Sequence, residues 1–328
     1  MMRILGLAAL SGASVGISSP LYAHVGKVEA NGIVLTYESH GPADQETILL
    51  IAGTNMQLTS WPSELCQELV KRGYRVITYD NRDVGLSTRF DAAGAPDFAA
   101  VVQAAQAGTP APLPYTLYDM AKDGVALLDA LAIRKAHIAG VSMGGMIAQI
   151  IATNYAERTL SLTSIMATDG NPGLPFVGKP EVIAKVPPPA PDGDRKAYIE
   201  RTVKLWQVIG SPGYPSDEET LLKTITRDVD RSYCPACEAR QAAAALFTSL
   251  EDRRTTLRSI RIPTVVIHGA EDPLVPLEAG RDTAANIPGA ELRVIPGMGH
   301  DLPRALIGTI ADWITAAASR GRAGATGK

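Results

Sequence analysis

The sequence predicts an α/β fold: a mostly parallel, twisted sheet with helices on both faces and an inserted helical cap. Two observations support this prediction. Short, continuous apolar runs alternate with stretches of helical periodicity, which is typical of a parallel sheet covered on both faces. A proline-rich and then helix-rich block, 169–257, interrupts this alternation and is predicted to form the cap. The chain of 328 residues is long enough for one large domain with such an insertion.

Composition and charge indicate which kinds of molecule the protein is expected to bind. An apolar fraction of 46% and a charged fraction of 20% are those of an ordinary soluble globular protein. The formal net charge is -3, and the sequence contains no basic block and no basic patch interleaved with aromatic residues. Nucleic acid is therefore not an expected partner.

The N-terminus has the pattern of a secretory signal peptide. A positively charged start, Met1-Met2-Arg3, precedes an apolar run at 4–17, and Ala23 stands at the expected cleavage position. Residues 1–23 are therefore predicted to be removed, and the protein is predicted to be periplasmic or secreted. A short apolar N-terminal helix on a cytoplasmic protein is the alternative. The run is too short and too rich in Gly and Ser for a membrane span, so no stable membrane insertion is expected.

The first part of the core, 24–168, is predicted to begin with a β-hairpin, because two alternating runs flank Asn31-Gly32. Arg82 and Asp83, in a polar loop at 80–87, are expected to hold that turn through hydrogen bonds. Apolar runs predict strands at 46–52, 74–79, 136–141 and 160–167. Helices are predicted at 61–71, 117–131 and 145–155, and the stretch 92–114 is expected to be irregular or partly helical.

The cap and the second part of the core follow. Within the cap, 169–257, helices are predicted at 195–209, 217–229 and 238–250. The second part of the core, 258–318, is predicted to hold strands at 262–268 and 291–295 and a final helix at about 302–318. Residues 319–328 are mostly Gly, Ala, Arg and Lys, and are predicted to form a disordered tail.

The stretch 137–145, HIAGVSMGG, carries the strongest chemical signal. It places Gly140-Val141-Ser142-Met143-Gly144 between an apolar run and a helical segment. A strand that enters a helix through G-x-S-x-G is a nucleophile elbow, with the serine at the tip of a sharp turn. Glycines two before and two after the serine let strand and helix approach closely. Ser142 is therefore the predicted nucleophile.

A serine hydroxyl needs a base, and the base needs an orienting acid. In the elbow architecture the order along the chain is serine, acid, histidine. His300 lies in a glycine-rich loop directly after the last predicted strand. Because parallel strands share their carboxyl-terminal edge, this loop is expected to open beside Ser142. His300 is therefore the predicted base.

The acid is expected in the loop that follows the strand 262–268. Asp272 stands there and precedes Pro273, which disfavours a mid-helix position. Asp272 is the predicted acid, with Glu271 as the weaker alternative. His268, at the end of the same strand, is expected to have a structural role.

Acyl transfer also needs amide donors that stabilise the oxyanion. Met143, which follows the nucleophile, is expected to supply one backbone N–H. Thr54, in the loop 52–56 after an early strand, is expected to supply the second, with Asn55 less favoured. Apolar residues near these loops are predicted to contact the substrate, namely Met56, Leu58, Leu274 and Val275.

The chain has three cysteines. Cys234 and Cys237 form C-P-A-C and are predicted to close a small disulfide loop in the exported protein. A zinc site would need two more ligands, and none lies near in sequence. Cys66 falls in a helical stretch and is predicted to be a small buried residue.

With these residues placed, the chain from about 26 to 318 resembles the α/β-hydrolase superfamily. The matching pieces are IAGTNM, YDNRDVGLS, GVSMGG, HGAEDPLVP and GMGH. Within it, the phrases LLIAGTNMQLTSWP, YDNRDVGLST and GVSMGGMIAQIIA look like the aclacinomycin methylesterase-type branch. The resemblance implies an α/β-hydrolase fold and a serine carboxylic-ester hydrolase with a helical cap and no metal or organic cofactor. Many members have His-Gly where this chain has Ala52-Gly53, which changes a side chain but not the donor amide.

The predicted function is hydrolysis of carboxylic esters of small or medium-sized apolar substrates through an acyl-enzyme intermediate. The same Ser142, Asp272 and His300 would also serve lactone or carbon–carbon bond hydrolysis, perhydrolysis or acyl transfer to another alcohol. A non-catalytic binding protein on this fold is a further alternative, which the complete set of three residues in the correct order disfavours. The expected partner is a small-molecule ester, and the protein is expected to be a monomer or a dimer.

Overall fold

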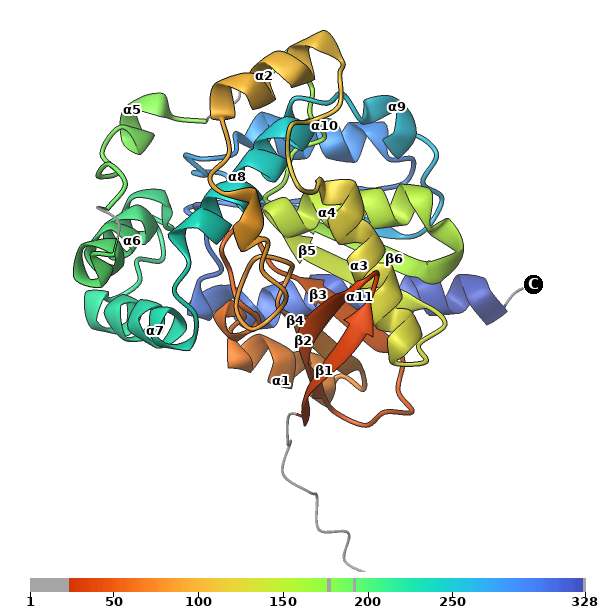
Figure 1. Cartoon of the computed structure of the whole chain (residues 1–328). Coiled ribbons are helices and arrows are strands. Elements are labelled where there is room, and N and C mark those ends of the chain that lie inside the picture. Colours follow the sequence, from red (N-terminus) through yellow and green to blue (C-terminus); the bar gives the residue numbers. More distant parts are fainter. Residues whose placement is uncertain (1–23, 176–177, 191–192, 327–328) are drawn as a thin grey trace, which may run out of the picture.

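The computed structural model describes residues 24–175, 178–190 and 193–326. The predicted signal peptide, 1–23, lies outside these residues. Within them the chain forms an eight-stranded sheet in the order β1-β2-β4-β3-β5-β6-β7-β8, with helices on both faces (Figure 1). The predicted α/β class with a mostly parallel sheet is confirmed.

The N-terminal hairpin lies at one edge of the sheet, as predicted. Strand β1 pairs antiparallel with β2 and β2 with β4, whereas every pairing from β4 to β8 is parallel. Asn31 and Gly32 have φ of 50° and 75°, the positive values that a two-residue type I′ turn requires. The strands are β1 His24–Ala30, β2 Ile33–His40, β3 Thr47–Ile51, β4 Arg75–Tyr79, β5 Ala136–Val141, β6 Thr159–Ile165, β7 Thr264–Gly269 and β8 Glu291–Ile295.

Two helical layers cover the sheet. Leu49 and Ile51 of β3 pack with α3 and α4, while Ile48 and Leu50 point to the opposite face, under α1 and α11. Every residue of β3, β5 and β7 is buried, as expected of parallel strands covered on both sides. The helices are α1 Ser63–Lys71, α2 Phe98–Ala107, α3 Leu117–Ala130, α4 Met143–Asn154, α5 Pro180–Ile183, α6 Arg195–Ile209, α7 Glu218–Arg231, α8 Pro235–Ser249, α9 Arg254–Leu257, α10 Leu277–Asn286 and α11 Ile307–Thr326.

The C-terminal helix is longer than predicted. Helix α11 continues to Thr326, so the predicted disordered tail is wrong for residues 319–326, and 327–328 lie outside the described residues. Alanine, the best helix former, recurs along this stretch. Gly321 also fits closely against β6, since a Cβ there would lie 2.5 Å from the carbonyl oxygen of Leu160. Packing against the sheet therefore adds to the intrinsic helix propensity.

The chain leaves the sheet after β6 and returns at β7. The segment between them carries α5 to α9, and α5, α6 and α7 lie to one side of the sheet (Figure 1). Helices α6 and α7 pack against each other around a small apolar cluster. Helix α8 packs against α2 and α3 of the core. These helices agree with the predicted ones, and the domain boundaries 169 and 257 stay a prediction.

The cysteines lie as predicted. Cys234 and Cys237 are joined by a disulfide at the N-terminal end of α8. Cys66 is a free, buried cysteine in α1. Burial raises the pKa of the Cys66 thiol to about 12, so it stays protonated and unreactive at neutral pH.

The loop 80–87 does more than hold its own turn. Arg82 pairs with Asp123 of α3 at 2.6 Å, and Asp83 pairs with Arg240 of α8 at 2.7 Å. All four side chains are buried. The predicted structural role of Arg82 and Asp83 is confirmed, but their ion-pair partners are distant in sequence and tie the loop to α3 and α8.

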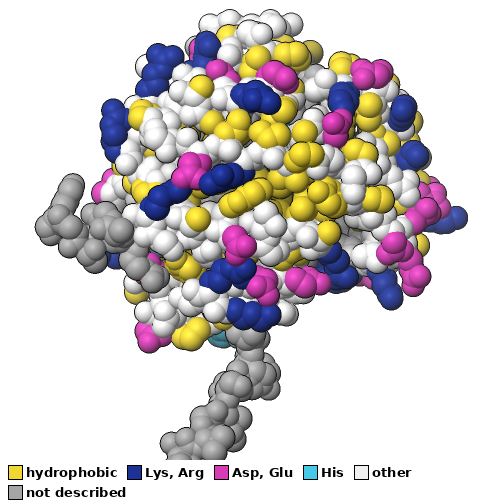
Figure 2. Space-filling model, turned by 180° about the vertical axis from the view of Figure 1, so that it is seen from behind, with side chains coloured by type: hydrophobic (Ala, Val, Ile, Leu, Met, Phe, Trp, Pro, Cys, Tyr) yellow, Lys and Arg dark blue, Asp and Glu magenta, His cyan; other side chains and the backbone are white. Residues whose placement is uncertain are grey.

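Among the described residues, no helix combines the length and the apolar character that crossing a membrane would need. On the face opposite to that of Figure 1, hydrophobic side chains gather near the middle, and acidic and basic side chains are interspersed around them (Figure 2).

Candidate active site

Ser142 stands between β5 and α4 in a strained conformation. Its φ of 55° is positive, which is uncommon for a residue with a side chain. The turn is tight: a Cβ on Gly140 would lie 2.0 Å from the carbonyl oxygen of Gly144. A Cβ on Gly144 would lie 2.0 Å from the carbonyl oxygen of Ile51 in β3. Only glycine fits at either position, so the two glycines let the turn present Ser142 at the sheet edge.

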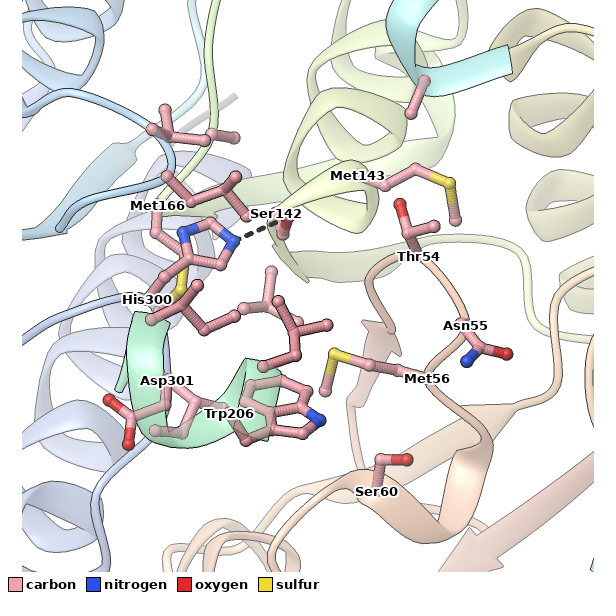
Figure 3. Close-up of a pocket in the computed structure, with 18 of the residues that line it drawn as sticks. Thr54, Asn55, Met56, Ser60, Ser142, Met143, Met166, Trp206, His300 and Asp301 are labelled. Carbon is pink, nitrogen blue, oxygen red and sulfur yellow. Dashed lines mark hydrogen bonds between the residues drawn. The ribbon is translucent and has the colours of Figure 1, made fainter. Parts of the chain in front are cut away.

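Three side chains from three strand ends form a hydrogen-bonded chain. The Ser142 hydroxyl lies 2.9 Å from Nε2 of His300 (Figure 3). On the other side of the ring, Nδ1 of His300 lies 2.7 Å from Oδ2 of Asp272. The other carboxylate oxygen of Asp272 accepts the backbone N–H groups of Leu274 and Val275, both at 2.9 Å. The arrangement allows His300 to take the serine proton while Asp272 holds the ring.

The electrostatics of Asp272 suit an orienting carboxylate. Burial acts to raise the pKa of Asp272, but the charge and hydrogen bond of His300, the nearby His268 and the backbone N–H of Val275 together outweigh it, and the pKa is lowered from its ordinary value. The carboxylate therefore stays ionised at neutral pH. An ionised carboxylate holds the imidazole in one orientation and stabilises the imidazolium form.

Neither of the two neighbours considered for the acid and base belongs to the hydrogen-bonded chain, although Nε2 of His268 lies 3.6 Å from Oδ2 of Asp272. Glu271 is largely exposed and pairs with Lys179 at 2.9 Å, so it is not a partner of His300. His268 is fully buried, and its Nε2 lies 3.0 Å from the carbonyl oxygen of Val275. Burial lowers the pKa of His268, which favours the neutral ring. It packs under the loop that carries Asp272.

The loop 52–56 passes directly beside the nucleophile, since a Cβ on Gly53 would lie 3.3 Å from the Cβ of Ser142. Figure 3 shows Thr54 and Met143 near each other at this point. Within the described part of the chain, neither the N–H of Thr54 nor that of Met143 has a protein acceptor. The N–H of Asn55 donates to Oε1 of Gln241 at 2.8 Å. Thr54 and Met143 are therefore the amides that remain for an oxyanion.

A cavity of about 1340 Å³ is lined by Ser142 and His300 at the sheet edge and by residues of α6, α7 and α8. Three of the four residues predicted to contact substrate also line it, namely Met56, Leu274 and Val275. Leu58 does not, so its predicted contact is corrected. Leu58 begins a short 3-10 turn and is buried, and its N–H donates to Oδ1 of Asp80 at 2.8 Å, which holds it inside the protein.

Much of the cavity wall was not predicted. Met166, directly after β6, lies near His300, and Trp206 comes from the cap (Figure 3). The wall contributed by α6 follows a helical period, because each member has another three or four residues away on the same face; they are Tyr198, Thr202, Leu205, Trp206 and Ile209. That period is visible in the sequence, but nothing local shows that the face meets a cavity instead of a core.

One grouping of potential metal ligands lies outside this cavity. Asp91 stands close to Cys234 and Cys237. The two sulfurs are bonded to each other, so neither is a thiolate ligand in this structure.

Comparisons with known proteins point to one family. A family model described as the alpha/beta hydrolase family matches residues 48–305. Rhodomycin D methylesterase DauP of Streptomyces sp. (strain C5) is 29% identical over 296 residues, covering 84% of this chain and 91% of that protein. Rhodomycin D methylesterase DnrP of Streptomyces peucetius is 29% identical over 298 residues, with the same shares covered, 84% and 91%.

Solved structures show the same fold. An enol-lactonase from Burkholderia xenovorans LB400 superposes with a TM-score of 0.64 at 22% identity, covering 90% of this chain and 100% of that one. A meta-cleavage product hydrolase from Pseudomonas fluorescens IP01 gives a TM-score of 0.66 at 20% identity, covering 92% and 98%.

Proposed function

Because the chain belongs to the alpha/beta hydrolase family, we propose that it cleaves carboxylic esters through an acyl-enzyme intermediate on Ser142. The resemblance predicted from its motifs is confirmed by the family match and by the methylesterase relatives. The protein is an enzyme of a hydrolytic family. The roles of its individual residues, given below, are part of the proposal.

In the proposed reaction, Ser142 Oγ attacks the ester carbonyl while Nε2 of His300 takes its proton. The amides of Met143 and Thr54 donate to the oxyanion of the tetrahedral intermediate, and each such donor lowers the barrier by about 3 kcal/mol. His300 then protonates the leaving alcohol, which leaves an acyl ester on Ser142. Water, deprotonated by His300, attacks this ester and releases the acid, and Ser142 recovers its proton. Asp272 stabilises the imidazolium in both halves.

The observation that carries the proposal is the unbroken hydrogen-bonded chain from Ser142 through His300 to Asp272. The three residues come from separate loops at the carboxyl ends of β5, β7 and β8, where ligands bind in open α/β sheets. Ser142 also opens onto the cavity. A nucleophile, its base, an orienting acid and free amides in one pocket support acyl transfer.

We propose that the substrate is larger than the small or medium-sized ester expected from the sequence. The cavity of about 1340 Å³ exceeds the roughly 300–1,000 Å³ typical of sites for drug-sized ligands. Apolar side chains such as Met56, Met166 and Trp206 form part of its wall. Two relatives are named rhodomycin D methylesterases, so methyl esters are the first class to test, and the size of the cavity favours methyl esters with a bulky acid part.

The test is hydrolysis of methyl esters of one-, two- and three-ring aromatic acids, with p-nitrophenyl acetate as a small reporter. We expect kcat/KM to rise with ring number. Ser142→Ala should reduce every rate by a factor on the order of 10⁶, with an unchanged circular dichroism spectrum. Activity that survives in Ser142→Ala would contradict the proposal.

A lactone-opening activity is the second candidate. A 3-oxoadipate enol-lactonase from Acinetobacter baylyi is 24% identical over 281 residues. If the wild-type protein opens lactones but hydrolyses no linear ester, and Ser142→Ala opens no lactone, then lactone hydrolysis replaces ester hydrolysis as the proposed function.

We also propose that the protein is exported, as its N-terminus predicts. The Cys234–Cys237 disulfide supports this, because disulfides persist in oxidising compartments. Cell fractionation followed by mass spectrometry is the test. A chain that begins at His24 in the periplasmic extract or the medium is expected, and a chain with an intact Met1 confined to the cytoplasmic fraction would contradict export.

A further inference from the structure

One residue of the loop beside the nucleophile is held by the cap. Asn55 follows Thr54 and has φ of 58°, a left-handed conformation that asparagine adopts more readily than other residues with a side chain. Its N–H donates to Oε1 of Gln241 in α8 at 2.8 Å. The two residues are 186 positions apart in sequence. The conformation of the loop therefore depends on a contact from the cap.

The side chain of Asn55 is held by the cap as well. Its Nδ2 donates to the hydroxyl of Tyr198 at 2.8 Å and to Oε2 of Glu238 at 3.2 Å. The Tyr198 hydroxyl in turn donates to the same oxygen of Glu238 at 2.5 Å. Three residues of α6 and α8 thus fix both the backbone and the amide group of one loop residue.

Gln241 is itself rigidly placed. It is fully buried, and its Nε2 donates to the carbonyl oxygen of Arg82 at 2.6 Å. One residue earlier, Arg240 forms its buried ion pair with Asp83. Helix α8 is therefore fixed to the core at the level of Gln241, and it presents a stationary acceptor to Asn55.

We propose that Gln241 is a positioning residue for the oxyanion hole, assisted by Glu238 and Tyr198, and that the cap thereby acts on the chemical step as well as on substrate binding. This inference rests on the proposed function. Because Gln241 engages the Asn55 N–H, the loop cannot turn that amide toward Ser142. The N–H of Thr54 is then left as the donor from this loop, on the side where Thr54 and Met143 meet (Figure 3).

The decisive variant is Gln241→Met, which keeps the volume but removes the acceptor. Misplacing one oxyanion donor by about 1 Å costs on the order of 100-fold. We expect kcat for p-nitrophenyl acetate to fall by about 10- to 100-fold with KM nearly unchanged. The inhibition constant of phenylboronic acid, which forms a tetrahedral adduct with a serine, should rise by a similar factor.

Two variants separate positioning from simple packing. Gln241→Glu keeps an oxygen for the Asn55 N–H. Burial favours the protonated carboxyl, which can still donate to the carbonyl oxygen of Arg82, so this variant should restore most of kcat. Thr248→Val is the matched control, because Thr248 is also buried in α8 but its hydroxyl donates to the carbonyl oxygen of Ala244 in the same helix. Wild-type kinetics are expected for this variant. If Gln241→Met does not fold, Tyr198→Phe removes the hydroxyl that holds Asn55 and should lower kcat by about 3- to 10-fold.

The outcomes are distinct. A kcat equal to wild type in folded Gln241→Met, or in Tyr198→Phe when that variant replaces it, overturns the inference. An equal loss in Gln241→Met and Gln241→Glu overturns the role of the acceptor oxygen. In the same assay, full activity in Ser142→Ala would instead remove the proposed function itself, whereas an inactive Ser142→Ala beside a normal Gln241→Met removes only this inference.

Discussion

The close approach of α4 to β3 gives the sharpest prediction, through Gly144→Ala. The added Cβ would lie 2.0 Å from the carbonyl oxygen of Ile51 and 2.7 Å from that of Ala52, whereas ordinary contacts are 3.4–4 Å. Both obstacles are backbone atoms, so no side chain can rotate away. The start of α4 and the end of β3 must separate by roughly 1.4 Å, the difference between the clash distance and the shortest ordinary contact.

This separation should affect both stability and rate. Overpacking typically costs 1–3 kcal/mol, and a clash with backbone belongs at the upper end, so we expect a loss of about 3 kcal/mol. For a chain of this size that lowers Tm by roughly 5 °C. The displaced elements carry Met143 and the loop of Thr54, so the two proposed oxyanion donors move apart. A kcat about 100-fold lower is expected on that ground.

Gly308→Ala is the matched control. Gly308 lies in the first turn of α11, is exposed, and has no atom within 4 Å of the position that a Cβ would take. Alanine there should raise the free energy of unfolding by about 0.5–1 kcal/mol and leave kcat unchanged. Urea unfolding and p-nitrophenyl acetate hydrolysis on both variants measure the two effects. A Gly144→Ala protein with the Tm and kcat of wild type would refute the reasoning.

Three further predictions concern buried charges. Asp272→Asn should lower kcat by about 10⁴-fold. Because folding lowers the pKa of Asp272, the stabilisation that its carboxylate provides is complete above the ordinary pKa of 3.8 and is lost as pH falls through the folded pKa. The Tm values of variant and wild type should therefore converge in acid, and they would not converge if the pairing were absent. Arg240→Met leaves Asp83 buried without its ion-pair partner and should lower the free energy of unfolding in urea by about 3–5 kcal/mol. Lys196→Met, which breaks an exposed pair with Glu200, should change this free energy by less than about 0.5 kcal/mol, and equal effects of the two variants would contradict a buried Arg240–Asp83 pair. Burial and the nearby Asp282 raise the pKa of Asp169 to about 6. Between the ordinary pKa of 3.8 and about 6 the folded state therefore binds more protons than the unfolded state, and stability falls as pH rises. Asp169→Asn should raise Tm at pH 8 but not at pH 3.5, and the same shift of Tm at both pH values would exclude this titration.

The core strands were predictable because their local pattern is sufficient. The bounds of β5, Ala136–Val141, match the predicted strand, since an apolar run ends at a glycine and a serine whose turn chemistry is specific. The bounds of α6, Arg195–Ile209, also match, because Asp194 caps the helix and Gly210 ends it. Where one short segment contains both its pattern and its stop signals, tertiary contacts change little.

The cavity wall and the loop anchors depend on contacts that no segment encodes alone. Leu58 and Met56 are both apolar and two residues apart, yet only Met56 lines the cavity, because Asp80 holds the N–H of Leu58. In the same way, α11 continues to Thr326 where Gly321 meets β6. In each case the partner is far away in sequence, and the sequence alone did not indicate which partner it would be.

The ion pairs between the cap and the core fix the position of the cap helices more than they raise the free energy of unfolding. Asp80 is fully buried and receives the N–H of Leu58 at 2.8 Å and the guanidinium of Arg231 in α7 at 2.7 Å. It therefore links the segment after the Thr54 loop to the cap. A buried ion pair often contributes little net stability, because desolvation offsets the attraction, but breaking one is costly. Such a pair strongly penalises any other placement of α7. Together with the Asp83–Arg240 pair, it keeps the cap at one distance from the loop whose amide the proposed reaction uses.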